Sequence, residues 1–108
     1  MIKVVSPVNI YLEAPPSQIA AEKKYLISTI FKLLPYKQDN YEYLDSYFES
    51  VLQRLCGFNK ISGFQPEVIT IMSLLEYARG EDDYKKYRKA VLDSCGLVEL
   101  IKESDVYD

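Results

Sequence analysis

The chain has 108 residues and a mass of 12.5 kDa, so residues 1–108 are expected to form one domain and are too short for two. Hydrophobic residues make up 48% and charged residues 27%, with 13 basic side chains against 16 acidic ones, which is an ordinary soluble globular composition. A net charge of −3 and a pI near 5.0 argue against a nucleic-acid-binding protein, because phosphate contacts need a clustered basic face.

Residues 1–14 predict a short extended or β arm. Residues 8–13 alternate apolar with mostly polar side chains at the period of a strand, and Ser6-Pro7 interrupts the stretch before them. A lone strand leaves backbone groups unpaired, so the arm either forms a hairpin at Ser6-Pro7, the preferred interpretation, or pairs with another chain. Pro15-Pro16 ends the extended segment and is suited to begin a helix.

Residues 16–103 predict a mainly α fold, a bundle of four to five helices. The first helix covers residues 16–34, where Pro35 ends it, and residues 36–38 form a linker. At 100° per residue, its apolar side chains form one arc that only Lys23 interrupts. That arc consists of Ile19, Leu26, Ile27, Ile30, Phe31, Leu33 and Leu34.

The second helix is predicted from its caps. Asp39, followed three residues later by Glu42, forms a capping box that satisfies two free backbone donors. Gly57 is expected to end the helix, and residues 58–65 then form a loop. The inward stripe consists of Leu44, Phe48, Val51, Leu52 and Leu55.

Two further helices complete the predicted bundle. Residues 66–79 place apolar side chains on both sides of a narrow polar line, so this helix is expected to be the buried centre. Residues 82–95 form the next helix, capped by Gly96. Residues 97–102 are expected to form a short terminal helix, and residues 104–108 a frayed acidic tail.

Side chains that carry out most protein chemistry are scarce. The chain has no His, and Cys56 and Cys95 are too far apart for a zinc motif. Both are expected to be free thiols in a cytoplasm, because no secretory signal is recognisable. Acidic residues 81–83 precede the basic residues Lys85, Lys86, Arg88 and Lys89, an order typical of a solvated helix that complements its own dipole. The apolar run 68–75 is too short to cross a bilayer, and no catalytic residue, metal or cofactor is predicted.

The informative feature is the load of aromatic side chains, ten Tyr and four Phe. Tyrosine suits a surface that is apolar on one side and wet at its edge, and several tyrosines fall off the predicted core stripes. We expect these aromatic side chains to line a groove that accepts an apolar helix from a partner; alternatively, they simply edge the core. The candidate partner-binding residues are Tyr25, Tyr36, Tyr43, Tyr47, Phe58 and Phe64.

Three segments follow one another along the chain: the extended stretch Val8–Glu13, the helix start Pro15-Pro16-Ser17-Gln18, and the stretch from Tyr84-Lys85-Lys86-Tyr87-Arg88-Lys89 to Cys95-Gly96-Leu97. Their order resembles that of the small tail-assembly chaperones of long-tailed bacteriophages, over nearly the whole chain. The resemblance implies a late-expressed cytoplasmic protein that is absent from the finished particle. It also implies a self-associating protein that coats the hydrophobic tape-measure protein until tail-tube subunits replace it.

We therefore expect a non-enzymatic interaction protein that forms homo-oligomers and shields hydrophobic helices of a tape-measure client, with no nucleic-acid or membrane partner. The alternative is a small acidic inhibitor or regulator that binds one host protein. A helix-turn-helix DNA-binding regulator is disfavoured by the long connection 58–65 and the acidic pI. An enzyme is disfavoured because neither thiol has a histidine base.

Overall fold

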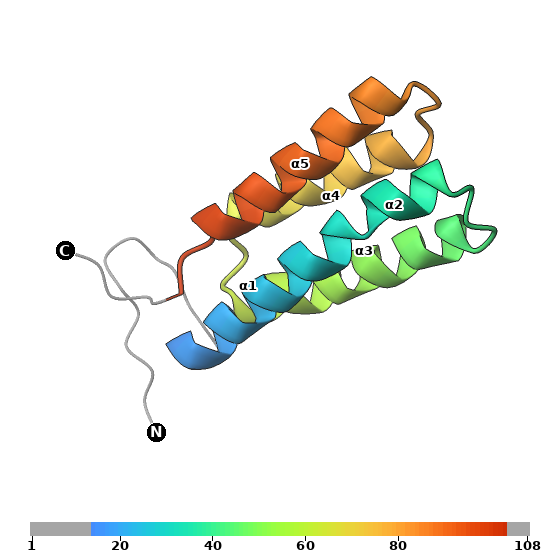
Figure 1. Cartoon of the computed structure of the whole chain (residues 1–108). Helices are drawn as coiled ribbons and strands as arrows, with labels where there is room; N and C mark the ends of the chain where they lie inside the picture. Colours follow the sequence, from blue (N-terminus) through green and yellow to red (C-terminus); the bar gives the residue numbers. More distant parts are fainter. Residues whose placement is uncertain (1–13, 104–108) are drawn as a thin grey trace.

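The computed structural model describes residues 14–103, in which helices run alternately up and down a bundle and no strand occurs (Figure 1). The helices are α1 (Pro16–Phe31), α2 (Leu33–Gln38), α3 (Leu44–Ile61), α4 (Pro66–Arg79) and α5 (Tyr84–Leu100). The mainly α prediction is confirmed. The arm predicted for residues 1–14, apart from Ala14, and the tail predicted at 104–108 lie outside the described residues.

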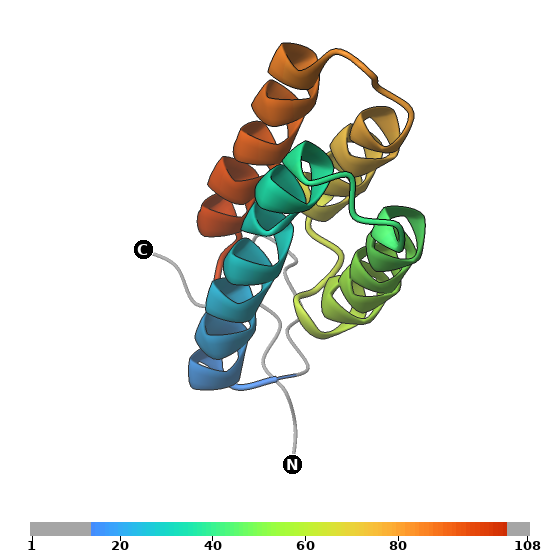
Figure 2. The ribbon, with the colours of Figure 1, turned by 45° about the vertical axis from the view of Figure 1, so that its right-hand side comes forward.

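The five helices form four rods, because α2 continues the line of α1, and the core lies between these rods (Figure 2). Each rod has two neighbours: α1 packs beside α3 and α5, and α4 packs beside the same two helices. Helical spacing of three and four residues brings one stripe of each rod to the axis. The fully buried side chains include Ile19, Leu26, Ile30, Leu33, Phe48, Val51, Leu55, Val68, Ile71, Leu75, Tyr87, Val91 and Val98.

The prediction that Pro35 ends the helical segment was wrong. Pro35 is the third residue of α2, and a proline in the first turn lacks an N–H that has no intrahelical partner anyway. Residues 36–38 are therefore helical and not a linker. The junction between α1 and α2 is anchored by the buried Tyr87, whose hydroxyl donates a hydrogen bond to the Leu33 carbonyl at 2.8 Å.

The bounds predicted for the second helix were also wrong. Asp39 is the C-cap of α2, and α3 begins at Leu44 without a side-chain cap. The helix continues through Gly57 to Ile61, and Gly63, with φ 84°, follows its end. The helix continues past Gly57 because the next residue, Phe58, extends the buried stripe. Burying that ring outweighs the roughly 1 kcal/mol cost of a mid-helix glycine.

The bounds of α4 match the prediction, but this helix is not the buried centre. It buries one stripe of four residues, and Ile69 on another face is 56% exposed. The following helix was predicted as two pieces and is one. Asp83 caps α5 by accepting a hydrogen bond from the Lys85 amide at 2.9 Å, and the helix runs through Gly96 to Leu100.

The C-terminal end of α5 is held by two polar side chains from other elements. The Lys23 ammonium, on α1, donates hydrogen bonds to the carbonyls of Glu99 at 3.1 Å and Ile101 at 2.7 Å. Gln65, before α4, exchanges two hydrogen bonds with the backbone of Lys102, at 3.0 and 2.9 Å. Lys23 therefore interrupts the apolar arc of α1 because the free carbonyls at the end of α5 need donors.

Candidate aromatic binding surface

Four of the six predicted binding residues lie on the side of the bundle formed by α1, α2 and α3, and two do not. Tyr25 is on α1, Tyr36 on α2, Tyr43 directly before α3, and Tyr47 in its first turn. They come from a stretch of only 23 residues in sequence, counting from 25 to 47. The hairpin between α1–α2 and α3 brings them to one side, because the two arms run antiparallel.

Four rings form what we call the tyrosine cluster: Tyr36, Tyr41, Tyr43 and Tyr47. Tyr36 lies between two of them, with its ring centroid 4.6 Å from that of Tyr41 and 5.0 Å from that of Tyr47. Tyr43 meets the ring of Tyr41 edge-on at 5.8 Å. Each distance is within the range of a favourable aromatic pair, so the cluster is continuous. Its outermost member, Tyr43, is 59% exposed.

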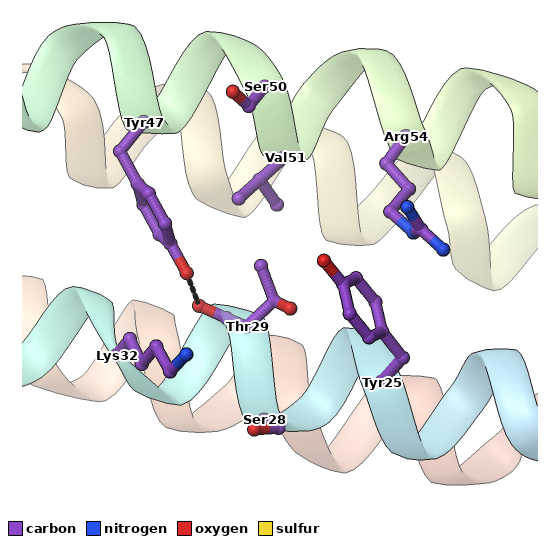
Figure 3. Close-up of a pocket in the computed structure, with 8 residues that line it drawn as sticks. All are labelled: Tyr25, Ser28, Thr29, Lys32, Tyr47, Ser50, Val51 and Arg54. Carbon is purple, nitrogen blue, oxygen red and sulfur yellow. Dashed lines mark hydrogen bonds between the residues drawn. The ribbon is translucent and has the colours of Figure 1, made fainter.

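The tyrosine cluster continues into the α1–α3 groove, which has a volume of about 320 Å³ (Figure 3). Tyr47 lies in both, and its hydroxyl donates a 2.6 Å hydrogen bond to the Thr29 carbonyl across the groove. Tyr25 enters the groove from the opposite wall and is 51% exposed. The lining residues are Tyr25, Ser28, Thr29, Lys32, Tyr47, Ser50, Val51 and Arg54.

Arg54 holds the Tyr25 end of the groove. Its guanidinium carbon is 4.0 Å from the centroid of the Tyr25 ring, which is a favourable cation–π distance. The same guanidinium donates two hydrogen bonds to the Glu22 carboxylate, at 2.6 and 3.0 Å, and these raise the pKa of Arg54. The bidentate pair restricts the rotation of Arg54, so the exposed Tyr25 ring has a defined position before any partner binds.

Burial raises the pKa of Tyr47 to about 12, and the neighbouring hydroxyls of Tyr36, Tyr25 and Tyr41 add to this effect. The neutral phenol is favoured because an ionised one would be poorly solvated between the two helices. Tyr47 therefore remains a hydrogen-bond donor at neutral pH and joins α3 to α1 beneath the exposed rings.

Because this pKa is raised in the folded state, the stability that Tyr47 contributes should be present below pH 10 and be lost as pH rises toward about 12. Urea unfolding at several pH values between 10 and about 12 measures this loss of stability. The loss should be smaller in Tyr47→Phe. Tyr43→Phe is the control, because its hydroxyl makes no hydrogen bond within residues 14–103 and the variant should lose stability as the wild type does. Equal pH dependence in wild type and Tyr47→Phe would contradict the assignment.

The two predicted phenylalanines lie elsewhere. Phe58 is only 2% exposed and belongs to the core, so its assignment to a binding surface was wrong. Phe64 is 66% exposed with φ 58°, but it lies in the α3–α4 turn at the opposite end of α3 from the tyrosine cluster. The sequence analysis missed Tyr41, which is 40% exposed and links Tyr36 to Tyr43. The position of Tyr41 two residues before Tyr43 could have indicated that it belongs to the same surface.

Several acidic side chains are engaged in structural contacts. Arg79 pairs with Asp45 at 2.6 Å and Glu49 at 2.8 Å, which joins α4 to α3. Glu81 accepts hydrogen bonds from the amide of Asp83 and the hydroxyl of Tyr77, and these lower its pKa. Within the described ranges, no group of three or more His, Cys, Asp or Glu could hold a metal ion.

None of the helices between residues 14 and 103 has the length and hydropathy needed to cross a membrane. Comparison with known protein families, with curated proteins and with solved structures finds nothing that matches this chain. The arrangement of its tyrosines is therefore the observation on which an account of its function depends.

Proposed function

We propose that this protein is a non-enzymatic interaction protein that shields hydrophobic helices, in the manner of the phage tail-assembly chaperones that it resembles. The tyrosine cluster and the α1–α3 groove form its client-binding surface. One observation carries this proposal: the rings of Tyr36, Tyr41, Tyr43 and Tyr47 are in unbroken contact, and Tyr47 extends them into a groove with the exposed Tyr25.

The chemistry of these rings supports an apolar helical client. A phenol offers a flat apolar face to leucine or phenylalanine side chains while its hydroxyl stays at the wet edge. Tyrosine has few rotatable bonds, so holding it against a partner costs little side-chain entropy. Tyr25 is additionally positioned by Arg54. Such a surface binds with modest affinity, which suits a client that must later be handed to tail-tube subunits.

The proposal is tested by producing the protein together with the tape-measure protein encoded by the same genome. We expect the client to remain in the soluble fraction and to co-purify with the wild-type chain, and to aggregate when Tyr25 and Tyr43 are both replaced by alanine. A client that is equally soluble with and without this chain would contradict the proposal. A one-to-one complex with a single host protein, with no effect on the client, would instead support an inhibitor or regulator.

Tyr43→Ala should weaken client binding and leave folding almost unchanged. Tyr43 is 59% exposed, and its one aromatic pair within residues 14–103 is the edge-on contact with Tyr41, so the free energy of unfolding should change by less than about 0.5 kcal/mol. If Tyr43 is among the few residues that carry most of the binding energy, its loss costs more than about 1 kcal/mol, or roughly a fivefold weaker affinity. Fluorescence titration with a synthetic amphipathic helix carrying Leu and Phe on one face measures this.

Tyr77→Ala is the matched control. Tyr77 is also exposed, at 50%, but it lies on α4, outside the tyrosine cluster and the groove. Its replacement should leave the affinity for the same peptide unchanged. Equal losses of affinity in both variants would show that any exposed tyrosine contributes and that the α1–α3 side is not a specific site.

A further inference from the structure

A second apolar surface lies across the seam between α1 and α5 and uses none of the tyrosines. On α1, Ile27 and Phe31 line a hollow of about 550 Å³, and Phe31 is 51% exposed. Beyond the seam, Leu92, Gly96 and Leu100 of α5 and Leu74 of α4 line a hollow of about 530 Å³, and Leu100 is 64% exposed. We call these six residues the seam face. The apolar arc predicted for the first helix included Phe31, and its assignment to the core was wrong because the side chain is exposed. Packing within one chain therefore does not account for a phenylalanine at this position.

The contacts between α1 and α5 set the register of the seam. The Cys95 thiol lies 3.8 Å from the Ile27 carbonyl, and the Lys23 ammonium lies 3.1 Å from the Glu99 carbonyl. Residue 27 is thus level with residue 95, and residue 23 with residue 99, on two antiparallel helices. This register places Ile27 beside Gly96. A side chain added at Gly96 would meet no atom within 4 Å, so the surface there is open.

The charges beside the seam face differ in sign on its two sides. Lys24, on α1, and Glu99, on α5, are both exposed, and neither makes an ion pair within the part of the chain that the structure describes. Burial, with a smaller contribution from the charge of Glu99 four residues later on α5, raises the pKa of the Cys95 thiol to about 11. The seam face therefore has a basic residue on its α1 side and an acidic residue on its α5 side.

We propose that the seam face binds a second copy of this chain in a two-fold symmetric dimer whose axis runs along the seam, parallel to the helices. A two-fold interface must be complementary to itself. Rotation about this axis places α1 of each copy over α5 of the other, at the same level along the bundle. Ile27 and Phe31 then cover the open surface around Gly96, and Lys24 faces Glu99 of the second copy. This inference does not rest on the proposed client-binding function.

The oligomeric state in solution tests the proposal. Size-exclusion chromatography with light scattering should give a mass twice the 12.5 kDa of one chain at concentrations of about 0.1–1 mM, a range that populates even a weak dimer. Phe31→Ser combined with Leu100→Ser should give the mass of one chain, with an unchanged circular dichroism spectrum. Ile69→Ser is the control, because Ile69 is 56% exposed on α4, outside the seam face, and this variant should remain dimeric.

A wild-type chain that stays monomeric over this concentration range overturns the proposal, and so does a dimer that survives the double substitution. If Ile69→Ser also abolishes the dimer, the interface does not lie at the seam face. These outcomes are independent of client binding, because none of the substituted residues lines the α1–α3 groove.

Charge exchange tests the two-fold arrangement itself. Lys24→Glu and Glu99→Lys should each weaken the homodimer about tenfold, because like charges then face each other twice in the interface. Mixing the two variants should restore dimerisation, since every facing pair is opposite in charge again. Failure of the mixture to dimerise more tightly than either variant alone would overturn the proposed arrangement.

Discussion

Replacing Phe58 with alanine is expected to lower the free energy of unfolding by about 3–5 kcal/mol. Phe58 is 2% exposed in the last turns of α3, and the substitution leaves a cavity in the core. Urea unfolding followed by circular dichroism measures the loss. Because domains of this size are stable by only about 5–15 kcal/mol in total, Phe58→Leu is the milder companion, with an expected loss of about 1–2 kcal/mol.

Phe64→Ala is the control for Phe58→Ala. The two phenylalanines are six residues apart, but Phe64 is 66% exposed and contributes little to the core. Its replacement should change the free energy of unfolding by less than about 0.5 kcal/mol. Equal losses in both variants would contradict the end of α3 at Ile61 and the burial of its last turn.

Lys23→Met is expected to cost about 2–3 kcal/mol of stability. The ammonium donates to the carbonyls of Glu99 and Ile101 and to the carboxylate of Glu103, the last at 3.0 Å. Methionine keeps the apolar stem of the side chain but leaves the carbonyls at the end of α5 without this donor. Urea unfolding gives the total loss, and hydrogen exchange should show faster opening of the last turn of α5.

Lys86→Met serves as its control. Lys86 is exposed on α5, so removing its charge should change stability by less than about 0.5 kcal/mol. If both lysine variants lose the same amount, the contacts of Lys23 do not stabilise the fold. A uniform increase in exchange along α5, without a larger effect in its last turn, would also contradict the assigned role.

Helix α1 contributes to both proposed interaction surfaces through adjacent faces, and Ser28 and Lys32 line both hollows. Tyr25 and Thr29 face the α1–α3 groove, whereas Ile27 and Phe31 belong to the seam face. A dimer through the seam face therefore uses neither Tyr25 nor Tyr47. Two grooves held in one dimer would bind a long helical client at two places, so that weak individual contacts add through effective concentration.

Much of the fold could be predicted from local patterns. Pro66 at the start of α4 and Gly80 directly after its end identify both bounds of that helix. The inward stripe of α3 was also predicted, because helical spacing alone groups Phe48, Val51 and Leu55 on one face. These features need only the geometry of a single helix, so one sequence suffices to find them.

Local capping signals failed where burial competed with them. Asp39 and Glu42 match a capping box, yet the chain turns between residues 39 and 43 and α3 starts later. Gly57 and Gly96 resemble helix ends but lie inside α3 and α5, because Phe58 and Val98 beyond them are buried by other helices. A cap contributes about 1 kcal/mol, which is less than the burial of a large side chain.

The sequence by itself determined the mainly α fold and a surplus of tyrosine beyond the core stripes, because periodicity and composition are properties of the chain alone. Tertiary structure decided that Tyr41 joins the tyrosine cluster, that Phe58 lies in the core and not on a binding surface, and that Phe31 is exposed. Those outcomes depend on which helix covers which face. Packing between helices that are distant in the sequence sets this, and the free energy of burial outweighs local preference there.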